Sequence, residues 1–84
     1  MYRIEIKSRA QKTLLGLAPE LQDRMIAAIR ALRPNPRGLG SRKLHGCEDT
    51  YRLRIGDYRV IYEIHDDCLI VAVIKIGHRR EVYR

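Results

Sequence analysis

The sequence has no tryptophan and no phenylalanine, so its core must be aliphatic with tyrosine at the edges. Its two cysteines are too few for a disulfide scaffold, and no Cys/His cluster has zinc spacing. The longest apolar run, from Cys68 to Ile74, is only seven residues, whereas a membrane helix needs about 20. The N-terminus also lacks the apolar segment of a signal peptide. We therefore expect a reduced cytoplasmic protein with no metal, no cofactor and no membrane partner.

The length of 84 residues leaves room for one domain, which we place at residues 1–84. The hydrophobic fraction of 45% and the charged fraction of 32% are typical of a folded globular chain. No repeat, linker or low-complexity segment interrupts it.

Positive charge is what the sequence has in excess. Lys and Arg number 17 against 10 Asp and Glu, and 13 of the 17 are arginine. A guanidinium binds phosphate oxygens in a bidentate manner, through two parallel hydrogen bonds, whereas an ammonium acts as a point charge. The excess indicates a nucleic acid or an acidic protein as partner. A basic surface that serves only solubility is the alternative.

Hydrophobic periodicity predicts a strand and two helices in the first part of the chain. Residues 2–7 alternate apolar and polar side chains, as in a half-buried strand. Ser8 and Gln11 have the spacing of a capping box, which predicts that a helix opens there and ends near residues 16–18. Pro19 suits the first turn of a second helix, which continues to about Leu32. The two helices should form an antiparallel hairpin.

The second part of the chain predicts a loop followed by three strands. Residues 34–46 are rich in Pro, Gly and Asn, which is typical of a loop. The period is two from residue 51 to 55 and again from 58 to 64, with Gly56 first in a type II′ turn between them. Residues 69–76 form a β-branched run that predicts a central strand. The order β-α-α-β-β-β predicts an α+β fold, with the helical hairpin on one face of a mainly antiparallel four-stranded sheet.

The sheet face away from the helices should carry a cluster of arginines. Arg52 and Arg54 are two residues apart on one strand and therefore project to the same side. The turn should place Arg59 of the next strand near them. Like charges gathered in this way repel unless an anion lies between them, and a phosphate would supply one. The alternative is a solvated sheet face without a ligand.

The residues of this face and of the chain end resemble the RelE/ParE toxin superfamily. The resemblance rests on residues 43–64, with Tyr-Arg-Val-Ile-Tyr at 58–62, and on residues 73–83, with Gly-His-Arg-Arg-Glu-Val-Tyr at 77–83. It implies a type II toxin that cleaves mRNA in the A site of the 30S ribosomal subunit. It also implies a cognate antitoxin, in a hetero-oligomer that can bind operator DNA through the antitoxin. The alternative within the superfamily is a ParE-type poison of DNA gyrase that has no nuclease activity.

The resemblance also assigns site residues. Its catalytic positions fall on five residues of this chain: Arg52, Arg54, Arg59, Arg79 and Tyr83. Arginine at 52 and 54 departs from the lysines usual in RelE-type members, and the chain stops one residue after Tyr83. These departures bear on proton transfer more than on the substrate class.

The chemistry of the residues suggests how such a site would work. Arg59 and Arg79 are suited to stabilising charge on phosphorus, but arginine is a poor general base. Tyr83 is a candidate base or a stacking residue. Four further residues are expected to contact RNA: Arg42, Lys43, His45 and His78. Either histidine could also serve as acid or base, since imidazole titrates near neutrality. A solvated loop and surface histidines without a role are the alternatives for these four.

Overall fold

The computed structural model describes residues 1–38, 41–44 and 49–78. Its elements follow one another as β1 (Arg3–Ile6), α1 (Ser8–Leu15), α2 (Pro19–Arg30), β2 (Ser41–Lys43), β3 (Thr50–Ile55), β4 (Tyr58–His65) and β5 (Ile70–His78). The strands form one sheet in the order β1-β5-β4-β3-β2, in which β1 pairs with β5 in parallel and all other pairs are antiparallel. Within this part of the chain, neither helix is long and apolar enough to cross a membrane.

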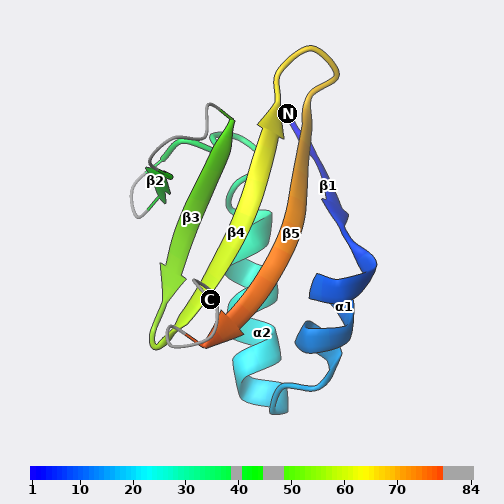
Figure 1. Ribbon diagram of the computed structural model, residues 1–84, viewed down its shortest axis with the longest axis vertical. Coiled ribbons are helices and arrows are strands. Elements are labelled where there is room, and N and C mark those ends of the chain that lie inside the picture. The colour runs from blue at the N-terminus through cyan, green and yellow to red at the C-terminus, as the bar shows by residue number, and fades with distance from the viewer. Residues whose placement is uncertain (39–40, 45–48, 79–84) are drawn as a thin grey trace.

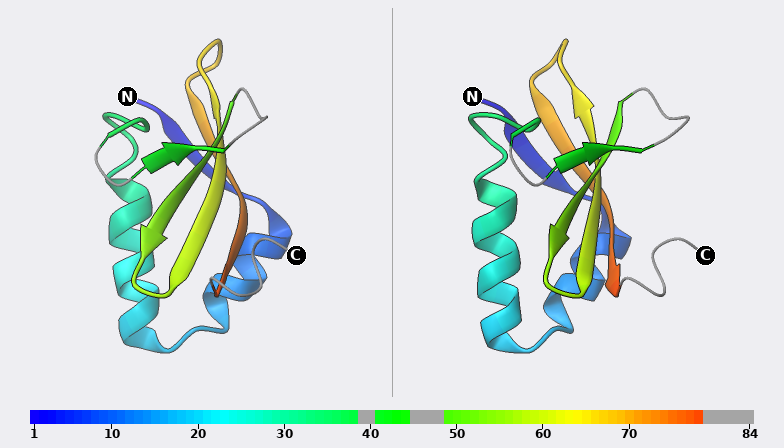
Figure 2. Two further views of the ribbon diagram at one scale, coloured as in Figure 1. Left: turned by 60° about the vertical axis from the view of Figure 1, so that its left-hand side comes forward. Right: turned by 90° about the vertical axis from the view of Figure 1, so that its left-hand side faces the viewer.

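Both helices lie on one face of the sheet, and the other face is free of helices (Figures 1 and 2). The predicted α+β class and the mainly antiparallel sheet are therefore confirmed. The predicted number of strands was one too small, because the sheet has five strands and not four.

The missed strand is β2, which lies inside the segment predicted to be a loop. Its three residues, Ser-Arg-Lys, are all polar and pair with β3 alone. A strand of this kind at a sheet edge has no buried side to produce alternation of apolar and polar residues, so periodicity does not detect it.

The helix starts agree with the sequence in one case and differ in the other. Pro19 is the first residue of α2, where its missing N–H costs no hydrogen bond. The predicted capping box, with Ser8 as the N-cap, was wrong, because Lys7 occupies the N-cap and no side chain caps the helix. The Lys7 amide donates to the Val73 carbonyl at 2.9 Å, which holds Lys7 extended and makes Ser8 the first helical residue.

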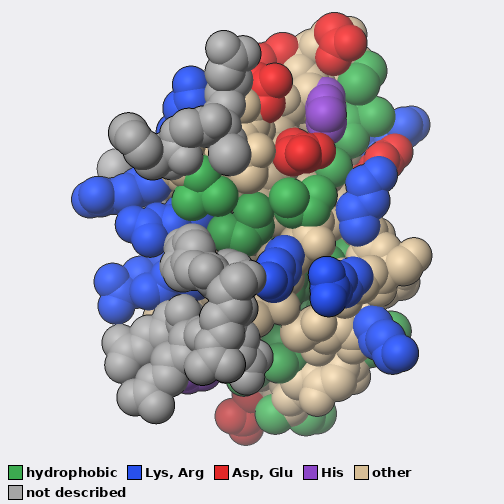
Figure 3. Space-filling model, in the orientation of Figure 1, with side chains coloured by type: hydrophobic (Ala, Val, Ile, Leu, Met, Phe, Trp, Pro, Cys, Tyr) green, Lys and Arg blue, Asp and Glu red, His purple; other side chains and the backbone are tan. Residues whose placement is uncertain are grey.

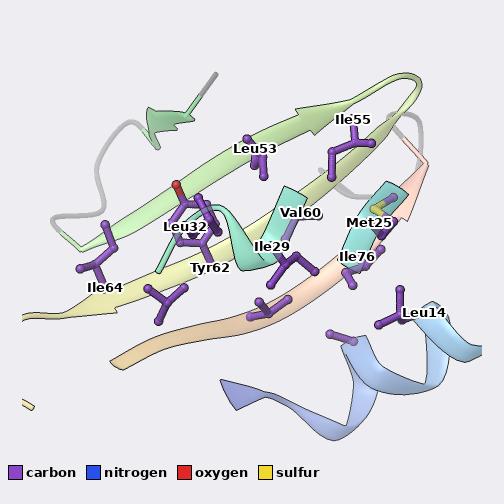
Figure 4. Packing of buried hydrophobic residues seen from close by; sticks show 13 residues of the cluster. Leu14, Met25, Ile29, Leu32, Leu53, Ile55, Val60, Tyr62, Ile64 and Ile76 are labelled. Atoms are coloured by element: carbon purple, nitrogen blue, oxygen red, sulfur yellow. The ribbon is translucent and has the colours of Figure 1, made fainter. Parts of the chain in front are cut away.

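The core lies between the sheet and the two helices (Figure 4). Tyr62, Ile64 and Val60 of β4 point into it beside Met25 and Ile29 of α2. Burying each large aliphatic side chain contributes about 1.5–3 kcal/mol. One face of β3, β4 and β5 is thus committed to packing, and the alternate residues face outward.

The hairpin between β3 and β4 sets the register of the outward residues. Gly56 has a φ of +58°, and Asp57 is not among the residues with positive φ. Positive φ at only the first central residue fits the predicted type II′ turn. The turn aligns Arg54 with Arg59 as direct cross-strand partners.

Candidate active site

An open hollow of about 820 Å³ lies on the helix-free face of the sheet. Its lining consists of four arginines, a glycine and an aspartate: Arg42, Arg52, Arg54, Gly56, Asp57 and Arg59. Figure 3 shows Lys and Arg side chains gathered on the side of this face where Figure 1 places β2 and β3. The clustering of Arg52, Arg54 and Arg59 that the sequence predicted is therefore present.

Strand register explains why these arginines meet. Arg42 of β2 is the cross-strand partner of Arg52, and Arg54 is the partner of Arg59. Direct partners on an antiparallel ladder have Cβ atoms about 4.5–5.5 Å apart. Four positively charged groups on three adjacent strands thus face one hollow, and like charges so placed favour an anionic ligand between them.

Arg59 is the most enclosed of the four, with only 8% of its surface exposed. Its Nη1 donates to the carbonyls of Tyr58 at 3.1 Å and Gly56 at 3.4 Å, so the hairpin turn holds the guanidinium in place. Its Nε is buried and has no hydrogen-bond partner in the described part of the chain. A buried donor left unpaired costs about 1–3 kcal/mol.

Asp57 is a site residue that sequence reasoning missed, because it was assigned only to the turn. Its exposed carboxylate lines the hollow beside the four guanidiniums. Asp57 is two residues before Arg59, and this spacing could have indicated that the two side chains project to the same side. One carboxylate among four arginines reduces the positive potential at the mouth of the hollow without neutralising it.

The remaining predicted residues are distributed differently. Lys43 is exposed next to Arg42 but does not line the hollow, since successive strand residues project to opposite sides. His78 is half-buried at the end of β5, where its ring meets the Tyr58 ring edge-on at 5.6 Å between centroids. It does not line the hollow either. The other three predicted site residues, His45, Arg79 and Tyr83, lie outside the described residues.

The described residues offer no group of three His, Cys, Asp or Glu side chains that could hold a metal ion. What the hollow presents is permanently charged hydrogen-bond donors, of which the Arg59 guanidinium is held in place by the hairpin. Donors of this kind stabilise negative charge that develops in a transition state, because they need little rearrangement when the charge appears.

Comparison with known proteins identifies the family. The sequence model described as "ParE toxin of type II toxin-antitoxin system, parDE" matches residues 4–83, which is nearly the whole chain. The chain belongs to the RelE/ParE toxin superfamily.

Relatives of this RelE/ParE toxin include proteins named for RNA cleavage. The "mRNA interferase toxin RelE" of Escherichia coli K12 is 30% identical over an alignment of 86 positions, which covers 98% of this chain and 90% of the relative. The crystal structure of the isolated E. coli RelE toxin superposes with a TM-score of 0.84 at 28% identity, covering 99% of this chain and 92% of that one. An archaeal RelE–RelB complex from Pyrococcus horikoshii gives a TM-score of 0.79 at 31% identity, covering 96% and 98%.

Proposed function

We propose that this RelE/ParE toxin is a ribosome-dependent endoribonuclease that cleaves mRNA in the A site and thereby inhibits translation. The observation that carries the proposal is the hollow with four arginines, in which the hairpin holds the buried Arg59 guanidinium in place. The similarity to a protein named mRNA interferase supports the reaction class. Residues 1–84 then act as a single toxin domain, in the cytoplasm where ribosomes are.

The reaction is an attack of the ribose 2′-oxygen on the adjacent phosphorus, which breaks the bond from phosphorus to the 5′-oxygen. It leaves a 2′,3′-cyclic phosphate and a 5′-hydroxyl. A proton must leave the 2′-hydroxyl, negative charge must be stabilised on the phosphoryl oxygens, and the 5′-oxygen must gain a proton. Arg59, Arg52 and Arg54 suit the second task, because each stays charged and donates from a planar fork.

Proton transfer needs a different group, because an arginine side chain has almost no free base at neutral pH. Tyr83 is our candidate base, and His78 is an alternative acid or base. Arg79 would join Arg59 in stabilising phosphoryl charge. Replacing Tyr83 by Phe separates two roles: the rate falls if the hydroxyl handles a proton, and it stays near wild type if the ring only stacks on a base.

The ribosome supplies what this small site lacks. Holding the 2′-oxygen in line with the bond that breaks lowers the activation free energy, because the reacting groups then need no further alignment. The hollow is open and surrounds no substrate on its own, so we expect little cleavage of free RNA. Arg42 would hold RNA backbone beside the reacting phosphate. Lys43, which projects to the other side of β2, and His45 would contact RNA farther from that phosphate.

Single-turnover cleavage on programmed ribosomes tests this function. We expect wild-type protein to cut mRNA within the A-site codon, and Arg52→Ala/Arg54→Ala protein to cut it at least 100-fold more slowly. Arg9→Met is the matched control, since it removes an exposed arginine of α1 far from the hollow. Equal rates for wild type and the double variant would show that the hollow is not the active site.

A second candidate function is poisoning of DNA gyrase by binding, the activity that the resemblance implies for ParE-type members. The name ParE in the matching family model is what favours it. Induced expression in cells separates the two functions. Cleavage of translated mRNA before any effect on DNA supports the nuclease. Double-strand breaks with intact mRNA would support the gyrase poison instead.

A cognate antitoxin is the protein partner we propose, because the similar archaeal toxin is seen in a RelE–RelB complex. A second hollow, of about 380 Å³, lies between β1 and α2. Four isoleucines form its apolar part and three arginines its charged part: Ile4, Ile6, Ile26, Ile29, Arg3, Arg30 and Arg33. An amphipathic antitoxin segment with acidic edges complements this surface in both respects. The hetero-oligomer would bind operator DNA through the antitoxin.

A further inference from the structure

A cluster of polar contacts joins three segments of the chain at the end of the sheet near the N-terminus of β1. Arg37 lies in the turn after α2, and Asp66 lies in the turn between β4 and β5. The guanidinium donates to both carboxylate oxygens of Asp66, from Nη1 at 3.2 Å and from Nη2 at 2.8 Å. Tyr2 also donates its hydroxyl to Asp66. The Arg37 guanidinium, with the Tyr2 hydroxyl second, holds the pKa of the Asp66 carboxyl below its usual range.

Arg37 also contacts β3. Its Nε donates to the Tyr51 hydroxyl at 3.2 Å, and its guanidinium carbon lies 5.6 Å from the centre of the Tyr51 ring. The Tyr51 ring stacks on Tyr62, with 6.0 Å between centroids. Tyr62 in turn donates its hydroxyl to the carbonyl of Pro36 at 2.7 Å. Pro36 and Arg37 are thereby fixed to β3 and to β4.

These contacts come directly before β2, the strand that carries Arg42. The carbonyl of Gly38 accepts hydrogen bonds from the Ser41 amide at 3.2 Å and the Ser41 hydroxyl at 2.7 Å. β2 itself has only three residues, pairs with one neighbour and contributes no side chain to the core cluster. So short an edge pairing is marginal in water. The position of β2 therefore depends on what holds the chain on either side of it.

The ion pair is too exposed to act mainly through global stability. The side chains of Arg37 and Asp66 are 41% and 55% exposed. Ion pairs at such positions contribute little to the free energy of unfolding. The bidentate contact nevertheless fixes how the Arg37 and Asp66 side chains are oriented toward each other, because two parallel hydrogen bonds allow only one arrangement. Loss of the pair should thus disturb the placement of β2 more than the fold.

We propose that Arg37 and Asp66 are positioning residues that hold β2 against β3 and so place Arg42 in the arginine hollow. The functional half of this inference, that Arg42 so placed binds RNA, rests on the proposed ribonuclease function. The structural half, that Arg37 and Asp66 hold β2 against β3, does not. Arg37 is not among the residues that line the hollow and would act on RNA only through Arg42.

The structural half is tested by amide hydrogen exchange on the whole protein. The Leu44 amide donates to the Thr50 carbonyl at 2.8 Å and reports on the β2–β3 pairing. In Arg37→Met and in Asp66→Asn we expect this amide to exchange about tenfold faster than in wild type, because local opening becomes easier. The Lys7 amide, bonded to Val73 at the other sheet edge, serves as the internal control and should not change. Unchanged exchange at Leu44 in both variants would overturn the proposal.

The functional half is tested by a double-mutant cycle with Arg42 on programmed ribosomes. Arg37→Met and Arg42→Ala should each raise KM about tenfold, the effect of losing one charged hydrogen bond, with little change in kcat. Since Arg37 acts through Arg42, the double variant should lie within about twofold of Arg42→Ala alone. Arg37→Lys keeps the charge without the fork and should restore only part of the loss.

The outcomes separate this proposal from the function on which it rests. If the two single losses multiply in the double variant, Arg37 does not act through β2 and the positioning role is wrong. If wild-type protein cleaves no mRNA on ribosomes, the ribonuclease function fails, and exchange at Leu44 alone decides whether Arg37 and Asp66 hold β2. Arg9→Met should match wild type in both assays.

Discussion

Arg59 combines burial and a fixed orientation in one side chain. The carbonyls of Gly56 and Tyr58 hold one end of the guanidinium, and the buried Nε has no partner among the described residues. Arg54, its cross-strand partner, is exposed, and within the described part of the chain no such contact holds its side chain. The four arginines of the hollow should therefore contribute unequally.

We predict that Arg59→Ala slows single-turnover cleavage on ribosomes by about 10²–10³, the usual loss for one preorganised donor. Arg59→Lys keeps the charge but removes the Nε donor, so it should recover only a small part of the rate. Binding to ribosomes should fall much less, since the other three arginines remain. Arg54→Ala is the comparison, with a smaller loss of rate. A loss for Arg54→Ala as large as that for Arg59→Ala would mean that burial of the guanidinium has no bearing on catalysis.

At the scale of single elements, the hairpin between β3 and β4 determines whether the site forms. Gly56 occupies a left-handed conformation, with φ of +58°, that other residues adopt only with strain. Among the described residues, a Cβ at this position would meet only Arg24, at 3.8 Å, which is an ordinary contact and no clash. The cost of substitution is therefore confined to the backbone.

We predict that Gly56→Ala lowers the free energy of unfolding by about 1–2 kcal/mol, measured by urea denaturation. Gly16→Ala is the matched control. Gly16 has a φ of −85°, and a Cβ there would lie at an ordinary 3.5 Å from the Thr13 carbonyl. Alanine at position 16 should leave stability unchanged or raise it slightly. Equal losses at the two glycines would show that positive φ is not the cause.

The contacts of Asp66 predict how pH affects the turn between β4 and β5. A carboxyl whose pKa is lower in the folded state stabilises the fold fully above its unfolded pKa and loses this effect as pH falls through the folded pKa. The pKa of Tyr2 is raised, chiefly by its hydrogen bond to Asp66, so Tyr2 stays neutral in this range. The difference in Tm between wild type and Asp66→Asn should be constant from about pH 5 to 8, begin to shrink near pH 4, and vanish only when the pH falls below the lowered pKa of folded Asp66. A difference that persists in acid would contradict the role of the Asp66 charge.

Elements whose residues pair or pack with a regular period could be predicted from the sequence, and elements held by distant contacts could not. Both helices and the strands on either side of Gly56 follow from local spacing, and so does the meeting of Arg52, Arg54 and Arg59. The strand β2 and the role of Arg37 have no local pattern, because the partners of Arg37 lie 14 and 29 residues away in the chain. The membership of Arg42 in the hollow depends on that strand.

At the scale of the whole molecule, the two hollows lie on opposite faces of the sheet. Figures 1 and 2 show both helices on one face of the sheet. The arginine hollow is lined from β2, β3 and β4 on the helix-free face, and the hollow rich in isoleucine is lined mainly from β1 and α2 on the helix side. No described residue lines both. RNA cleavage and antitoxin docking can therefore be changed independently, which a single shared surface would not allow.

We predict that Ile26→Glu separates toxicity from its neutralisation. Ile26 is 39% exposed at the second hollow, so glutamate can reach water without disrupting the core, while its charge repels the acidic edges of an antitoxin segment. The variant should cleave mRNA on ribosomes at the wild-type rate and bind antitoxin at least tenfold more weakly by calorimetry. Ala27→Glu, an exposed neighbour on α2 that does not line the hollow, should retain both activities.

Conversely, Arg59→Ala should lose cleavage and keep antitoxin affinity within about threefold, apart from a small change in long-range charge attraction. If Ile26→Glu binds antitoxin as tightly as wild type does, the antitoxin docks elsewhere, and the hollow between β1 and α2 is not its principal contact.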